Sequence, residues 1–101
     1  MKFGLKEESL QKIIDTLKSN KKVAEAILFG SRALGTQKNG SDIDIALKGT
    51  HLERNDILKL LVTCDDLYLP YKLDLILYST IEEKALIEHI DRVGINLFTR
   101  K

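Results

Sequence analysis

The sequence has 101 residues, the size of one compact domain, so we expect residues 1–101 to form a single domain. Apolar residues make up 44% of the chain and charged residues 31%, a composition that excludes disordered and fibrous proteins. Sixteen basic residues balance fifteen acidic ones, and the net charge of +1 excludes attraction of nucleic acid or of an anionic membrane by the overall field.

The chain begins with a predicted helix, a strand and a loop. An amphipathic helix is indicated by apolar residues at helical spacing, namely Leu10, Ile13, Ile14 and Leu17. A buried strand follows over residues 23–29 and stops at Gly30. Residues 30–41 hold three glycines and almost no large apolar side chain, so we expect a loop with room for one helical turn.

A second strand and a second helix follow this loop. The alternation over residues 42–48 predicts a half-buried strand with Asp42, Asp44 and Ala46 on its outward face. A helix that ends before Pro70 is indicated by a second apolar stripe, which consists of Ile57, Leu60, Leu61, Cys64 and Leu67.

The last third of the chain predicts two strands and a helix. Residues 72–77 alternate as a strand whose outward face carries Asp74. The next helix, which closes at Gly94, is expected to open with a capping box, either Ser79-x-x-Glu82 or Thr80-x-x-Glu83. Residues 95–98 form a possible edge strand. Together these elements predict an α+β fold, a small mixed β-sheet with helices packed mainly on one face.

The sequence predicts a cytoplasmic protein. Its longest uninterrupted apolar stretches have four residues, far below the about 20 that a membrane helix needs. No apolar signal segment follows the charged N-terminus. Cys64 is the single cysteine and cannot form an internal disulfide, which fits a reducing compartment.

Three aspartates on predicted strands form the candidate catalytic and metal-binding set. Asp42 and Asp44 lie two residues apart, so their Cα atoms are about 6.6 Å apart on one strand face. Asp74 completes a three-carboxylate site if its strand pairs with the strand of Asp42 and Asp44, since neighbouring strands lie about 4.8 Å apart. Hard oxygen ligands favour Mg²⁺ or Mn²⁺, and Mg²⁺ commonly takes phosphate oxygens as further ligands, which predicts a nucleotide. Two such ions could flank an in-line phosphoryl transfer.

The loop after the first strand is the candidate phosphate-binding segment. Backbone N–H groups at a glycine-bounded turn can face an anion, and the Ser31 hydroxyl adds a donor to those near Gly30. Arg32 offers positive charge where pyrophosphate charge develops, and Lys38 is a weaker candidate for that role. Ser41, just before the aspartate pair, is a further candidate nucleotide contact.

Each of these residues also has a purely structural interpretation. Asp42, Asp44 and Asp74 are ordinary solvent-facing acids if no loop faces them, Gly30 can simply end a strand, and Ser31 can cap a helix.

Five other side chains receive no role in this site. The helical position of Cys64 indicates a small core residue, and His51 and His89 have no metal-ligand partner by spacing. Tyr68 and Tyr71 either form an exposed apolar patch or cap the core.

The segments GSRALG, SDID and KLDL resemble the nucleotidyltransferase signature of the DNA polymerase beta superfamily. More narrowly, nearly the whole chain resembles the minimal nucleotidyltransferases, or MNT proteins. The resemblance implies the nucleotidyltransferase fold, metal binding by Asp42, Asp44 and Asp74, and contact of Gly30 and Ser31 with the triphosphate. It also implies pairing with a helical HEPN protein, on which some MNT antitoxins adenylylate a tyrosine.

We therefore expect a Mg²⁺-dependent enzyme that transfers a nucleoside monophosphate, expected to be AMP from ATP, to a hydroxyl and releases pyrophosphate. The predicted elements use nearly all positions and provide no acceptor pocket, so a partner protein is expected to present the acceptor. One alternative is a module that binds nucleotide or neutralises a partner without turnover. Another is modification of a small molecule of the antibiotic type, for which a homo-oligomer or second chain would have to shape the pocket.

Overall fold

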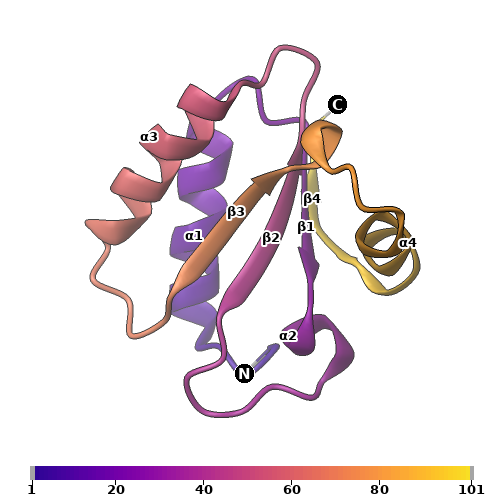
Figure 1. The fold of residues 1–101 in the computed structure, drawn as a ribbon. Helices are drawn as coiled ribbons and strands as arrows, with labels where there is room; N and C mark the ends of the chain where they lie inside the picture. The colour runs from indigo at the N-terminus through magenta and orange to yellow at the C-terminus, as the bar shows by residue number, and fades with distance from the viewer. Residues whose placement is uncertain (1, 101) are drawn as a thin grey trace.

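The computed structural model describes residues 2–100 (Figure 1). Its elements are, in chain order, α1 (Glu7–Ser19), β1 (Glu25–Phe29), α2 (Ser31–Leu34), β2 (Ile43–Lys48), α3 (Arg54–Asp65), β3 (Leu73–Leu77), the 3-10 helix η1 (Tyr78–Thr80), α4 (Lys84–Val93) and β4 (Ile95–Thr99). The predicted α+β class is confirmed, and α2 is the single helical turn expected inside the loop. No helix within residues 2–100 is both long and apolar enough to cross a membrane.

The four strands form one mixed sheet in the order β3-β2-β1-β4. β1 is antiparallel to both of its neighbours, β2 and β4, whereas β2 and β3 are parallel. A parallel pair needs a long crossover connection, and α3 supplies it between β2 and β3. The strand predicted over residues 95–98 is therefore the edge strand β4.

α1 and α3 cover one face of the sheet and α4 lies against the other (Figure 1). The larger core lies under α1 and α3, where fully buried side chains include Ile13, Leu17, Leu28, Ile45 and Leu47. The smaller core joins α4 to the sheet through Ile27, Phe29, Ala46 and Ile90. Two of the three long helices thus share a face, and the third covers only part of the opposite face.

The capping box predicted near residue 80 is wrong. η1 occupies Tyr78–Thr80, and α4 begins at Lys84 after the N-cap Glu83, which makes no side-chain capping bond. The Thr80 hydroxyl instead donates to the Leu77 carbonyl at 2.8 Å, which stabilises the 3-10 turn.

The capping box that the structure contains lies at α3. There the Glu53 side chain accepts from the Asp56 amide, and the Asp56 carboxylate accepts from the Glu53 amide at 2.9 Å. This pair satisfies two free donors of the first helical turn. The Glu53 hydrogen bond is the main cause that lowers the pKa of Asp56. Because the box uses Glu and Asp rather than Ser or Thr with Glu, the sequence pattern did not reveal it.

Two of the open questions about the α3 region are settled by packing. Cys64 is buried, as expected of a core residue, and burial raises the pKa of its thiol to about 11. Tyr68 is 89% exposed in the turn after α3, while Tyr71 packs under the Arg32 guanidinium, 5.2 Å from its ring centre. The two tyrosines therefore do not form one patch. α3 itself ends at Asp65, before the last predicted apolar position.

Candidate active site

Two of the three predicted aspartates face each other across neighbouring strands. β2 and β3 are parallel with Asp44 opposite Asp74, and Asp44 is also opposite Phe29 of β1. Partners in register project from the same face of a sheet, so Phe29, Asp44 and Asp74 form a row across three strands. Asp42 lies just before β2, two residues from Asp44. The structure therefore places Asp44 beside Asp74 at the start of two parallel strands, with Asp42 two residues before Asp44 in the chain.

The charges of the three carboxylates act on one another at Asp44. Burial raises the pKa of Asp44, and repulsion from Asp74 and then from Asp42 raises it further. The positive charge of Arg32 acts in the opposite direction. The cluster is therefore short of compensating positive charge around Asp44.

The donor set fits a hard divalent cation. Within residues 2–100, no three side chains of His, Cys, Asp or Glu converge closely enough to form a finished metal site. Carboxylate oxygens are nevertheless the type of ligand that Mg²⁺ and Mn²⁺ prefer, and Mg²⁺ usually completes its octahedron with water and phosphate oxygens. The mutual repulsion at Asp44 is the feature that a bound cation would relieve.

Gly30 brings the loop backbone against this cluster. Its φ is 77°, in the region that favours glycine, and a Cβ at this position would lie 2.5 Å from Asp44 Oδ2. Ser31 follows as the first residue of α2. Only glycine therefore allows the end of β1 to approach Asp44 and then turn into α2.

Arg32 has a structural role that sequence reasoning did not foresee. It is only 3% exposed, and its guanidinium donates to the carbonyls of Phe3 and Ser41, both at 2.8 Å. These bonds tie the N-terminal segment and the residue before Asp42 to α2. The Ser41 hydroxyl accepts the Lys38 amide at 2.8 Å and closes the loop turn. Contacts of Arg32 and Ser41 with a nucleotide stay predictions.

α4 limits the open part of this face. The outward position of Ala46, two residues after Asp44, is completely buried in the small core beneath α4. The expectation of an outward-facing row along the whole strand is therefore correct only for its acidic beginning. The part of β2 and β3 that carries Asp44 and Asp74 therefore lies outside the small core.

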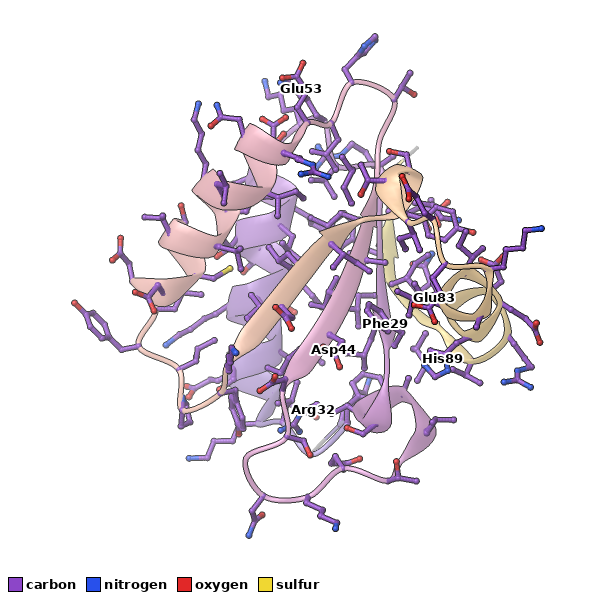
Figure 2. All side chains as sticks on the ribbon, in the orientation of Figure 1. Phe29, Arg32, Asp44, Glu53, Glu83 and His89 are labelled. Carbon is purple, nitrogen blue, oxygen red and sulfur yellow. The ribbon has the colours of Figure 1, made fainter. Side chains whose placement is uncertain are left out.

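His89 belongs to the site although its sequence context assigned it no role. Its Nε2 accepts the Gly30 amide at 3.0 Å, and its ring packs edge-on against Phe29, with 6.2 Å between ring centres. Figure 2 shows His89 projecting from α4 toward the end of β1. The only signal in the sequence was its place next to Ile90 on the apolar stripe of α4, and that signal does not reveal which loop the helix meets. His51 is exposed in the connection before α3.

Known proteins resemble this chain in sequence and in fold. The family described as "Polymerase beta, Nucleotidyltransferase" matches residues 11–101. A crystal structure of a toxin–antitoxin with AMP-PNP has a TM-score of 0.75 and 28% identity over 91% of this chain and 74% of that chain. The toxin–antitoxin MntA–HpeT with two Asp-to-Glu substitutions has a TM-score of 0.74 and 26% identity over 91% and 74%. No curated protein matches significantly.

A more distant structure shares the fold alone. It is the tri-AMPylated HEPN toxin of Shewanella oneidensis in complex with an MNT antitoxin, with a TM-score of 0.71 and 22% identity over 95% of this chain and 74% of that chain. The structural neighbours are thus MNT antitoxins in complexes with HEPN toxins, as the resemblance implied. Because the family match extends over residues 11–101 and the fold and acidic row agree with it, the chain belongs to the polymerase beta family of nucleotidyltransferases.

Proposed function

We propose that this nucleotidyltransferase transfers AMP from ATP to a hydroxyl group on a helical HEPN-type partner and thereby acts as the antitoxin of a toxin–antitoxin pair. The observation that carries the proposal is the register of Asp44 with Asp74, next to Asp42 and the Gly30 turn. This row supplies the carboxylates for a metal–triphosphate complex at one end of the sheet. The cytoplasm, which holds ATP and Mg²⁺, is the compartment that this proposal implies.

Asp42, Asp44 and Asp74 would hold Mg²⁺ or Mn²⁺. When bound, the ion neutralises charge on the triphosphate and stabilises the charge that develops during transfer. Asp74 is the most exposed of the three and lies on the outer strand of the sheet, β3. We assign it a second task, acceptance of the proton from the acceptor hydroxyl.

The loop residues orient the triphosphate. The Ser31 hydroxyl and the first amides of α2 are available as donors to phosphate oxygens, and Gly30 lets this backbone lie against Asp44. The acceptor oxygen then forms a bond to the α-phosphorus, the bond from that phosphorus to the pyrophosphate oxygen breaks, and the hydroxyl proton moves to Asp74. The products are the AMP-modified partner and pyrophosphate.

The similar proteins support a partner-presented acceptor. Two structures that share at least 26% identity with this chain are toxin–antitoxin complexes, and one of them holds AMP-PNP. The other carries two Asp-to-Glu substitutions two positions apart, the same spacing as Asp42 and Asp44. An aromatic hydroxyl, that of tyrosine, is the acceptor we propose.

Intact-mass spectrometry tests this function. The purified chain, its HEPN partner, ATP and Mg²⁺ are incubated together, and we expect the partner to gain the mass of AMP. Asp42→Asn should abolish the gain, whereas Asp65→Asn, an exposed acid at the end of α3, should not. A partner that is bound and neutralised without any gain in mass would replace this proposal with the non-catalytic alternative.

A further inference from the structure

The side chain of His89 joins α4 to the proposed phosphate loop. His89 and Gly30 are 59 positions apart in the chain, and the hydrogen bond between them joins α4 to the turn that follows β1. Phe29, Asp44 and His89 lie on the side of the sheet that α4 covers (Figure 2). The contact therefore connects a helix outside the sequence motif to the centre of the candidate site.

The imidazole is held firmly enough to position its partner. Ile90, the next residue of α4, is 1% exposed in the small core, which anchors this turn of the helix. The His89 ring also meets Phe29 nearly perpendicularly, at 81°, an arrangement that aromatic rings favour. Since Nε2 accepts this bond, it is the ring nitrogen that carries no proton in this contact.

Both backbone polar groups of Gly30 have partners in this arrangement. Its amide donates to His89, and its carbonyl accepts the Leu34 amide at 3.1 Å inside α2. The residue has φ 77° and ψ −156°, a conformation that other residues rarely adopt. Because the amide of Gly30 is already used, the loop donors that face a triphosphate begin at Ser31.

We propose that His89 is a positioning residue for nucleotide binding: by accepting the Gly30 amide it fixes the glycine turn and thereby directs Ser31 toward the triphosphate. This assignment rests on the proposed function. It adds a residue outside the GSRALG, SDID and KLDL segments, and it removes the Gly30 amide from the set of phosphate donors.

A scalar coupling across the hydrogen bond tests the geometry directly. In the wild-type chain labelled with ¹⁵N, we expect a coupling between the Gly30 amide nitrogen and His89 Nε2. His89→Leu removes the acceptor, and the coupling should disappear while thermal unfolding stays cooperative. A wild-type spectrum without this coupling overturns the proposal, whatever the chain does to ATP.

Calorimetry with MgATP tests the consequence for binding. His89→Leu should weaken MgATP binding about 3- to 10-fold, the effect of losing one hydrogen bond that orders the loop. His89→Gln keeps an acceptor at a similar reach and should recover part of the affinity, and His51→Leu is the control that should bind as the wild type does. Equal affinity of His89→Leu and the wild type overturns the proposal.

These measurements separate the two proposals. A wild-type chain that binds MgATP but adds no AMP to its partner contradicts the proposed function, while the affinity series still decides the role of His89. Conversely, normal transfer together with unchanged affinity in His89→Leu supports the function and rejects the positioning role.

Discussion

At the scale of single residues, Asp44 is held where its charge is disfavoured. Burial and two neighbouring carboxylates raise its pKa above the ordinary value of 3.8. The folded protein therefore binds more protons than the unfolded chain as the pH rises past 3.8, so the ionisation of Asp44 decreases stability over that range. The charged form of Asp44 is thus a local loss of stability, as is common at functional sites.

Asp44→Asn should raise the Tm of the metal-free protein at pH 7, because it removes one of three repelling charges. The difference in Tm from the wild type should shrink as the pH falls toward the ordinary aspartate range, where Asp44 becomes neutral in the wild type too. Removing a residue that only supports a metal ligand lowers metal affinity or activity about 10- to 100-fold. Removing the proposed ligand Asp44 itself should therefore lower AMP transfer more than about 100-fold. Thermal melts in EDTA and mass spectrometry measure the two effects; a lower Tm with normal transfer would contradict both.

Arg32→Met should destabilise the protein by about 2 to 4 kcal/mol, because two partly buried carbonyls, of Phe3 and Ser41, lose a charged donor. Urea unfolding measures this loss, and Arg92→Met, on the exposed surface of α4, is the matched control. If Arg32→Met keeps its stability but loses MgATP affinity, the direct nucleotide contact predicted from the sequence is the better account of Arg32.

At the scale of elements, the packing of α4 decides the shape of the site. α4 ends against the sheet at Gly94, where a Cβ would lie 2.3 Å from the Ile90 carbonyl oxygen and 2.5 Å from Ile27 Cγ2. Glycine at this point allows the chain to leave α4 and enter β4 directly. The close packing of α4 on β1 at Gly94 also keeps His89 near the end of β1.

Gly94→Ala should therefore destabilise the protein by about 1 to 3 kcal/mol through overpacking, and it should also weaken the bond between His89 and Gly30. Ile27→Ala removes the Cγ2 methyl that the new Cβ would strike. In a double-mutant cycle by urea unfolding, the two substitutions together should cost less than the sum of the single costs. Strict additivity would show that Ile27 does not limit the space at Gly94.

At the scale of the whole molecule, one sheet carries two surfaces with different tasks. The face under α1 and α3 is apolar throughout and supplies most of the core, whereas the opposite face changes from acidic to apolar along β2. This change separates the open acidic end from the part that α4 covers. A ligand bound at the acidic end thus contacts β2, β3 and the turn after β1 at once, and it should stabilise the whole fold.

MgATP at 100 times its dissociation constant should stabilise the protein by about 2.7 kcal/mol, a Tm increase of about 10 °C or more for a chain of this size. Differential scanning fluorimetry measures the shift. EDTA should abolish most of it, since the triphosphate would then meet three uncompensated carboxylates, and Asp42→Asn should reduce it. An equal shift with and without the metal would contradict the cation site.

The elements and the positions of the acidic residues on their strands could be predicted from the sequence because both are local in origin. Apolar spacing identified the helices and strands to within a few residues, and the positions of Asp42 and Asp44 follow from the two-residue period of a strand. The capping box at residue 80 failed because Thr80 uses its hydroxyl in a 3-10 turn, a choice between two local hydrogen bonds that the pattern does not resolve.

By itself the sequence determined the fold class, the acidic strand ends and the glycine turn, because periodicity and residue chemistry are properties of the chain. Only the tertiary structure decided that Asp74 lies opposite Asp44, since the pairing of strands depends on the crossover through α3. It also decided that Arg32 is a buried anchor and that His89 reaches Gly30. These contacts join residues far apart in the chain, and they are determined by which helix packs on which face, not by any local pattern.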